Sequence, residues 1–325
     1  MKNIKQLYKE YKNSIHWYGK IEIGNIKQWI LVRGKNKDNP IILFLHGGPG
    51  ISYTPFITEF QKELEDYFIV VNWDQRGAGK SFESKENIKG TMTINQFVID
   101  TYELIKRLQK RFGKKKIYLV GHSWGSAIGL IVAKKYPELL FAFIGVGQVV
   151  NYKEEDRISY EYILEMAKKS KKKRIITKIE KIGYPPYIKN SSKKIHQKWL
   201  MKFDGKEKGI NLKCLLIKGI IEHPLYTLID GVYYIFGKNF TEKEMQKELE
   251  NINFFDTIEE LNVPLYICAG KFDYITPTSL SKKYFDKLKC DKKEFIYFDK
   301  SAHFPLFREY KKFNEILIKI VEGLL

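Results

Sequence analysis

Short continuous runs of apolar residues recur along the first part of the chain, separated by stretches in which apolar residues follow a helical period. Each run is five or six residues long, which is typical of a strand that is buried on both faces. These runs occupy residues 40–45, 68–73, 116–120 and 141–146. The stretches that predict helices are 53–66, 93–112 and 126–136. Strands that alternate with helices of this length predict βαβ units in a mostly parallel sheet.

Turn and capping residues mark the ends of two further features. A looser alternation over 21–33 predicts a β-hairpin that turns at Gly24 and Asn25. The helix over 93–112 has Thr93 in its capping position and Gly113 just beyond its end, where the left-handed backbone favours glycine.

The alternation stops over residues 151–250, which are rich in charge, helical in pattern and without a buried-strand run. Strand signals return at 263–269 and 294–298, and a closing helix is predicted over 309–325. We therefore expect an α/β sheet domain in two parts, residues 1–150 and 251–325, interrupted by a helical cap over residues 151–250.

Composition places the chain among globular proteins. It has 325 residues, of which 44% are hydrophobic and 14% aromatic, and no apolar run approaches the roughly 20 residues that span a bilayer. Residues 1–20 are polar and lack the apolar segment of a secretory signal. The three cysteines are scattered, which predicts reduced thiols and no metal site. We expect a cytoplasmic protein with no membrane partner.

The formal net charge of +19 raises the question of a nucleic-acid partner. Only seven of the 57 basic residues are Arg, the residue that nucleic-acid sites favour for bidentate contacts. We therefore expect no nucleic-acid partner. The densest basic run, residues 168–174, is interpreted as a solvated helix face, and contact with an anionic surface is the less favoured alternative.

One pentapeptide carries the strongest chemical signal in the chain. Residues 121–125 read Gly-His-Ser-Trp-Gly, directly after a predicted strand and directly before a predicted helix. A G-x-S-x-G sequence in that setting is the nucleophile elbow, a sharp turn that presents a serine hydroxyl at the edge of a sheet. Ser123 is the predicted nucleophile.

A serine nucleophile needs a base, and the base needs a carboxylate that orients it. In α/β-hydrolases the chain order is Ser, acid, His, with each residue on a loop after a strand. Asp273 and His303 satisfy both conditions, whereas the rival acids Asp256 and Asp299 do not lie on a loop that follows a strand and precedes the histidine. The predicted catalytic residues are therefore Ser123, Asp273 and His303.

Acyl transfer also needs N–H groups that stabilise an oxyanion. One donor is expected from the residue after the nucleophile, which is Trp124. The other is expected from the glycine-rich loop at residues 46–50, where Gly48 is preferred because Pro49 has no N–H.

The stretch from Asp74 to Ser81 resembles a phosphate loop only superficially, because Gln75 stands where that motif needs its first glycine. We interpret it as a structural stretch that holds the loop after the second buried strand against the active-site rim, with Asp74 and Arg76 forming an ion pair.

Taken together, these motifs resemble the proline iminopeptidase branch of the α/β-hydrolases, peptidase family S33. The resemblance is carried by His-Gly-Gly-Pro-Gly at 46–50, Asp-Gln-Arg-Gly at 74–77 and Gly-His-Ser-Trp-Gly-Ser at 121–126. It implies the α/β-hydrolase fold with a helical cap and cleavage of an N-terminal proline, or another small N-terminal residue, without a cofactor or metal. In this family acidic cap residues bind the free amine of the substrate. The candidates by position are Glu154, Glu155, Glu161 and Glu222.

The leading hypothesis is thus a serine hydrolase that acts as an aminopeptidase on peptides through an acyl-enzyme. A carboxylesterase or amide hydrolase that uses the same three residues on a small molecule is the main alternative. A ligand-binding protein without catalysis is a more distant one. A buried carboxylate that faces Ser123 from the cap would favour the aminopeptidase.

Overall fold

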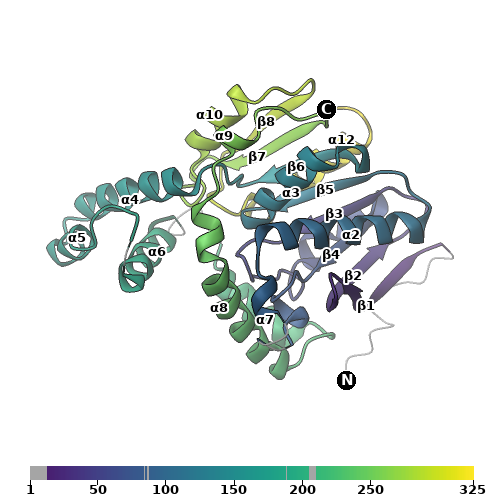
Figure 1. Cartoon of the computed structure of the whole chain (residues 1–325), viewed down its shortest axis with the longest axis horizontal. Helices are drawn as coiled ribbons and strands as arrows, with labels where there is room; N and C mark the ends of the chain where they lie inside the picture. The colour runs from purple at the N-terminus through teal and green to yellow at the C-terminus, as the bar shows by residue number, and fades with distance from the viewer. Residues whose placement is uncertain (1–12, 84, 86–87, 188, 205–209) are drawn as a thin grey trace.

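An eight-stranded sheet forms the centre of the molecule in the computed structural model (Figure 1). The structure describes residues 13–83, 85, 88–187, 189–204 and 210–325. The strands are β1 (Ile15–Ile23), β2 (Ile26–Gly34), β3 (Ile41–Leu45), β4 (Ile69–Trp73), β5 (Ile117–His122), β6 (Leu140–Val146), β7 (Leu265–Gly270) and β8 (Lys293–Phe298). Their order across the sheet is β1-β2-β4-β3-β5-β6-β7-β8.

Strands β3 to β8 are parallel, and the antiparallel hairpin β1–β2 extends the sheet at one edge. Ile23 pairs with Ile26, so Gly24 and Asn25 form the turn, as the sequence predicts. All five residues of β3 are buried, as expected of a central strand covered on both faces. The predicted α/β-hydrolase architecture is therefore confirmed.

Helices cover both faces of the sheet because alternate side chains of each strand point to opposite sides. Leu43 and Leu45 share a core with the helices of one face, whereas Ile42 and Phe44 share a core with those of the other. The first face carries α2 (Ile94–Phe112), α3 (Trp124–Lys135), α9 (Phe254–Thr257) and α10 (Thr278–Lys287). The second carries α1 (Thr58–Gln61), α11 (Pro305–Arg308) and α12 (Tyr310–Val321).

The ends of α2 follow the sequence prediction closely. The Thr93 side chain accepts a hydrogen bond from the Gln96 N–H, and Gly113 is left-handed with φ of 64°. The helix predicted over 53–66 is shorter, because α1 begins only at Thr58 and continues as a 3₁₀ helix over Lys62–Asp66. Pro55 has no N–H to donate, and the Thr54 hydroxyl bonds to Asp74 instead of the local backbone. Other 3₁₀ turns lie at Gly79–Ser81, Lys89–Thr91 and Pro137–Leu139.

Between β6 and β7 the described residues form no strand, and five helices precede α9. They are α4 (Tyr152–Lys169), α5 (Lys173–Glu180), α6 (Asn190–Asp204), α7 (Leu212–Glu222) and α8 (Leu228–Glu250). In Figure 1, α4, α5 and α6 project away from the sheet, while α7 and α8 lie beside it. Asn151 and Asn253 form a β-bridge, so the chain enters and leaves this helical region at adjacent points.

No helix within the described ranges is long and apolar enough to cross a membrane. All three cysteines are free thiols.

Candidate active site

Ser123 occupies a sharp turn between β5 and α3. Its backbone has φ of 52° and ψ of −119°, a conformation that is strained for a residue with a side chain. The turn also brings α3 against β3, since a Cβ added to Gly125 would lie 2.2 Å from the Leu45 carbonyl oxygen. The local geometry is that of a nucleophile elbow.

Asp273 and His303 are in direct contact. His303 Nδ1 lies 2.9 Å from Asp273 Oδ2, and both side chains are almost completely buried. Asp273 follows β7 and His303 follows β8, and these adjacent parallel strands bring their two loops to the same edge of the sheet. Because the carboxylate oxygen accepts the proton of Nδ1, the neutral imidazole keeps its lone pair on Nε2, as a general base requires.

Three donors from the loop after Asp273 fix the orientation of its carboxylate. Oδ1 accepts the N–H groups of Ile275 and Thr276 at 2.9 and 3.0 Å, and Oδ2 accepts the Thr276 hydroxyl at 2.8 Å. The same hydroxyl oxygen lies 3.2 Å from His303 Nδ1. Sequence reasoning missed Thr276, since a threonine on a loop carries no signal of its own.

His122, the residue before Ser123, joins the elbow to the His303 loop. Its Nε2 lies 2.8 Å from the His303 carbonyl oxygen, which can only accept, so Nε2 carries the proton. Its Nδ1 then accepts the hydroxyl of Tyr53 at 2.7 Å. Burial lowers the pKa of His122 well below its usual value, and repulsion between the two rings when both are protonated adds to this effect, so the ring of His122 stays neutral.

The glycine-rich loop after β3 lies against the elbow. A Cβ added to Gly47 would be 3.2 Å from the Ser123 Cβ, and Gly48 lines the same cavity as Ser123 and Trp124. Gln75 ties the two segments together, since its amide donates to the His46 carbonyl at 3.0 Å and accepts the Trp124 indole N–H at 3.0 Å. The sequence predicts that this stretch lies at the rim of the site, but it does not single out Gln75.

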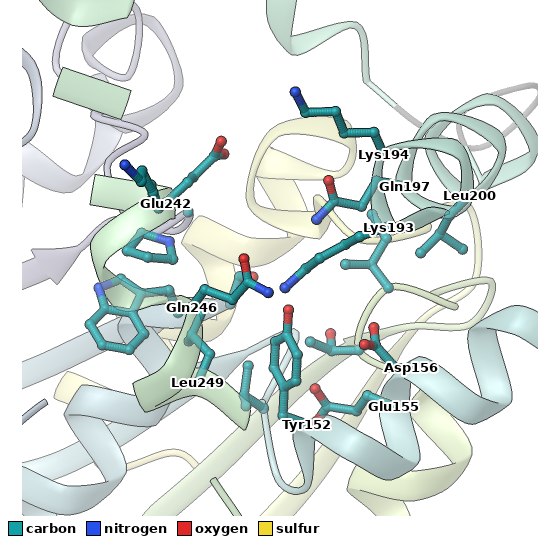
Figure 2. A pocket seen from close by; sticks show the side chains of 18 of the residues that line it. Tyr152, Glu155, Asp156, Lys193, Lys194, Gln197, Leu200, Glu242, Gln246 and Leu249 are labelled. Atoms are coloured by element: carbon teal, nitrogen blue, oxygen red, sulfur yellow. The ribbon is translucent and has the colours of Figure 1, made fainter. Parts of the chain in front are cut away.

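Ser123 lines a cavity of about 570 Å³, which Figure 2 shows from close by. Ser123, Gly48 and Thr276, from segments that follow strands of the sheet, are part of its lining. The remainder of its lining comes mostly from α4, α6 and α8. It includes Tyr152, Glu155, Asp156, Lys193, Lys194, Gln197, Leu200, Glu242, Gln246 and Leu249.

Among the four acidic residues proposed from the sequence, Glu155 lines this cavity and the other three do not. Glu155 is buried, and its Oε1 accepts the N–H groups of Val150 at 2.7 Å and Asn151 at 3.3 Å. The side chains of the other three are 36–52% exposed and pair with basic neighbours on their own helices. They are Glu154 and Glu161, which bind Arg157, and Glu222, which lies beside Lys218.

Burial changes the protonation of the acids in the cavity. It raises the pKa of Glu155 to about 8, although the Val150 and Asn151 N–H groups oppose the rise. Burial also raises the pKa of Asp156 to about 6, and the Lys193 ammonium opposes this rise. Asp156 and Glu242 are further carboxylates of the lining that sequence reasoning did not single out.

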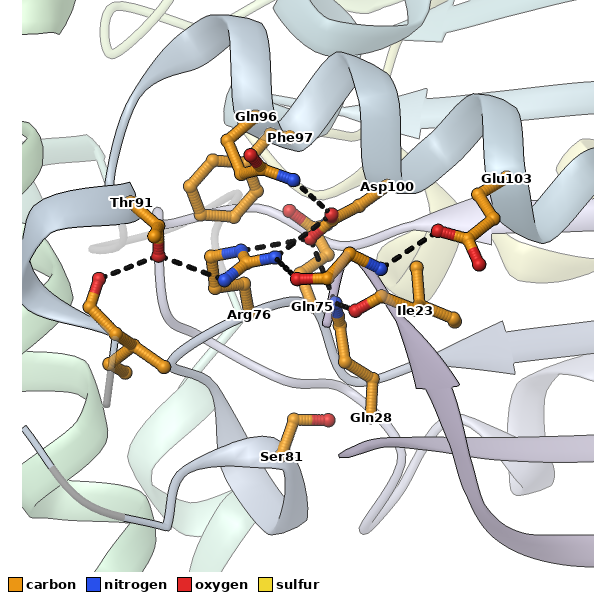
Figure 3. A network of polar contacts seen from close by, with 12 residues as sticks. Ile23, Gln28, Gln75, Arg76, Ser81, Thr91, Gln96, Phe97, Asp100 and Glu103 are labelled. Atoms are coloured by element: carbon orange, nitrogen blue, oxygen red, sulfur yellow. Dashed lines mark hydrogen bonds and ion pairs between the residues drawn. The ribbon is translucent and has the colours of Figure 1, made fainter. Parts of the chain in front are cut away.

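The predicted ion pair between Asp74 and Arg76 is wrong. Arg76 instead forms a buried bidentate ion pair with Asp100 on α2, at 2.9 and 3.0 Å (Figure 3). Asp74 accepts hydrogen bonds from the Ser52 and Thr54 hydroxyls and from the Lys80 N–H. Successive side chains of this loop point in different directions, so two residues of one motif serve separate networks.

In the described part of the chain no three His, Cys, Asp or Glu side chains come together as metal ligands would.

The sequence is 35% identical over 315 residues to the probable aminopeptidase YbaC of Bacillus subtilis, covering 94% of this chain and 96% of the relative. The proline iminopeptidase of Saccharolobus solfataricus is 26% identical in sequence, covering 90% of this chain and 86% of the relative. That of Clostridium botulinum is 27% identical, covering 86% of this chain and 88% of the relative. Residues 40–170 match the α/β hydrolase fold family. The chain belongs to the proline iminopeptidase-like family of α/β-hydrolases.

Solved structures agree with this family on the level of the fold. A proline iminopeptidase-related protein from Thermus thermophilus superimposes with a TM-score of 0.64 at 18% identity, covering 95% of this chain and 98% of that one. The proline iminopeptidase of Mycobacterium smegmatis superimposes with a TM-score of 0.65 at 13% identity, covering 94% of this chain and 98% of that one. This member of the proline iminopeptidase-like family is thus a hydrolase built on a mostly parallel sheet with an inserted helical region.

Proposed function

We propose that this hydrolase is a serine aminopeptidase that releases an N-terminal proline, or another small N-terminal residue, from peptides in the cytoplasm. One observation carries the proposal: Ser123 and the buried carboxyl group of Glu155 line the same cavity. A site that cleaves after the first residue needs a nucleophile and, one residue away, an anion for the free amine. The relatives named as a probable aminopeptidase and as a proline iminopeptidase support the same assignment.

In the proposed mechanism the Ser123 hydroxyl attacks the carbonyl carbon of the first residue while His303 Nε2 takes its proton. Asp273 holds the imidazole through Nδ1 and stabilises the imidazolium that forms. The N–H groups of Gly48 and Trp124 stabilise the oxyanion. His303 then protonates the leaving amine, and water attacks the acyl-enzyme with His303 again as base.

The helical region over residues 151–250 serves as the cap in this proposal, with residues 1–150 and 251–325 as the sheet domain. Its helices α4, α6 and α8 supply most of the cavity wall, so the cap selects the substrate and excludes water. Glu155, at the start of α4, accepts the substrate ammonium group. Because its pKa lies at about 8 without substrate, it binds the amine best where it has lost its proton.

An esterase or amide hydrolase acting on a small molecule is the second candidate, and the raised pKa of Glu155 is the observation that favours it. A carboxyl group that is neutral at pH 7 makes the cavity suitable for an uncharged substrate. The pKa of Asp156 lies lower, at about 6, so this carboxylate is an anion in the cavity at neutral pH. Its charge weighs against the esterase hypothesis.

Blocking the substrate amine separates the two candidates. The rates on prolyl and alanyl arylamides are compared with those on their N-acetylated forms and on a simple aryl ester, with Ser123→Ala as the blank. The aminopeptidase proposal predicts that acetylation lowers kcat/KM by at least about 100-fold, the loss expected when a buried charge partner goes unmatched. Equal rates on free and acetylated substrates, with faster ester cleavage, would favour the esterase.

A further inference from the structure

Helix α8 exposes an unusually large apolar face. Half of its circumference is buried against the sheet domain, where the Tyr234 hydroxyl donates to the Ser52 carbonyl at 2.9 Å and the Thr241 hydroxyl to the Gly77 carbonyl at 3.0 Å. The other half of its first turns carries six large apolar side chains at helical spacing, each 47–76% exposed. We call these residues the apolar face: Leu228, Ile229, Val232, Tyr233, Ile235 and Phe236.

A helical segment that is apolar on nearly all sides is ordinarily buried on all sides. The first turns of α8 are of this kind, but half of their surface is exposed. The preceding helix α7 packs against α8 and adds two more exposed apolar residues, Ile217 at 48% and Ile221 at 68%. Single exposed apolar residues are normal on a protein surface, whereas a contiguous group of this size marks an interaction site.

A basic groove adjoins the apolar face, and its positive charge indicates that the partner of this face is anionic. The groove, of about 510 Å³, is lined by Phe236 of the apolar face and by the lysines Lys85, Lys89 and Lys243. Among its described residues it holds one carboxylate, Glu244. The whole chain carries a net charge of +19. Two copies of so basic a chain repel one another, while an anionic surface attracts both the groove and the molecule as a whole.

We propose that the apolar face and the basic groove together dock this hydrolase onto an anionic lipid bilayer surface. The apolar side chains enter the boundary between headgroups and acyl chains, and Lys85, Lys89 and Lys243 contact the phosphate groups. The contact is interfacial and requires no membrane-spanning helix, and it differs from the sequence-based expectation of no membrane partner.

The placement of α8 connects this surface to the cavity that Ser123 lines. Asn239 and Lys243, one and two turns beyond the apolar face, line both the basic groove and the cavity. A bilayer bound to the apolar face would therefore lie beside one wall of the cavity. Docking does not depend on the reaction that Ser123 performs, so it can be tested apart from the proposed peptidase activity.

The test is co-sedimentation of the purified full chain with vesicles of phosphatidylcholine alone, or of phosphatidylcholine and phosphatidylglycerol in equal parts. We expect sedimentation with the anionic vesicles only, weakened by salt. A variant with Ile229→Gln, Val232→Gln and Phe236→Gln should lower the bound-to-free ratio about tenfold, and one with Lys85→Gln and Lys89→Gln by a similar factor.

Matched controls carry the same substitutions elsewhere on the surface. Tyr67, Ile99 and Leu324 are 40%, 40% and 69% exposed and lie outside the apolar face, so their change to Gln should leave binding unaltered. Lys106→Gln with Lys110→Gln, on exposed positions of α2, is the control for charge. Circular dichroism and thermal melting establish that each variant is folded.

Three results would overturn the proposal. One is no binding to anionic vesicles by the unaltered protein. Another is unchanged binding of the apolar variant to anionic vesicles, since the lysines alone would then account for the binding. The third combines two findings: the unaltered protein does not bind vesicles, and light scattering without lipid shows that it is a dimer whereas the apolar variant is a monomer. This result would assign the face to a second copy of the chain.

Discussion

The Nε2–H group of His122 donates a hydrogen bond of 2.8 Å to the backbone carbonyl oxygen of His303. This bond links the residue before the proposed nucleophile to the residue proposed as its base, across 181 positions of sequence. Since Ser123 is held by the turn and His303 by its loop, the bond sets the distance between the two segments. His122 is therefore a positioning residue in this account.

Replacing His122 with alanine should slow turnover without unfolding the protein. Loss of the bond lets the His303 loop shift, and a misplacement of about 1 Å costs on the order of 100-fold in rate. We expect kcat to fall about 10- to 100-fold with KM little changed, measured at steady state on a prolyl arylamide. Tyr53→Phe, which removes only the outer hydroxyl partner of His122, should have a smaller effect. An undiminished kcat in His122→Ala would contradict the positioning role.

Glu155→Gln should separate substrate binding from stability. The amide oxygen can still accept the Val150 and Asn151 N–H groups, so the fold is kept, but the side chain can no longer pair with an ammonium group. We expect KM for the prolyl arylamide to rise at least about tenfold, the loss of a buried charged partner, while kcat on an uncharged ester is retained. Equal KM values in the two proteins would remove Glu155 from the substrate site.

The stability of the same variant, relative to the unaltered protein, should change with pH in one direction. The pKa of Glu155 is raised from 4.5 to about 8 in the folded protein. Between these values the folded state holds a proton that the unfolded chain has released, so this group lowers the free energy of unfolding as pH rises. The difference in Tm, that of Glu155→Gln minus that of the unaltered protein, should therefore become more positive as pH rises from below 4.5 to above 8. A constant or opposite difference in Tm would show that burial does not perturb Glu155 in this way.

The ion pair of Arg76 with Asp100 should matter for stability. Both side chains are fully buried, and Arg76 also donates to the Gly24 carbonyl and the Thr91 hydroxyl (Figure 3). Arg76→Ala leaves Asp100 as a buried charge and should cost about 3–5 kcal/mol in the free energy of unfolding, measured by denaturant titration. The control is Arg107→Ala, which breaks an exposed pair with Glu103 and should cost less than about 1 kcal/mol. Similar losses in both variants would contradict the assignment.

Much of the fold could be predicted because it depends on local pattern. Apolar runs such as residues 41–45 are typical of central strands. Thr93 and Gly113 mark the ends of α2 through local hydrogen bonding and backbone conformation. The order of Ser123, Asp273 and His303 after their strands could also be read from the chain, and their catalytic roles stay predictions.

The features that sequence reasoning missed depend on contacts between distant elements. The partner of Arg76 lies on α2 rather than two residues away, because the guanidinium points away from Asp74 toward that helix. The acidic residues of α4 are alike in sequence and differ only in burial, so the chain could not distinguish Glu155 from Glu154. Gln75 and Thr276 support the site through bonds to segments that no local motif reveals.

The most direct measurement is the steady-state rate of the purified protein on a prolyl arylamide, beside that of Ser123→Ala. The account predicts release of the arylamine by the unaltered protein and a loss of nearly all turnover in the variant, with an unchanged circular dichroism spectrum and Tm. Turnover by Ser123→Ala at the rate of the unaltered protein would contradict the proposed nucleophile and the mechanism built on it.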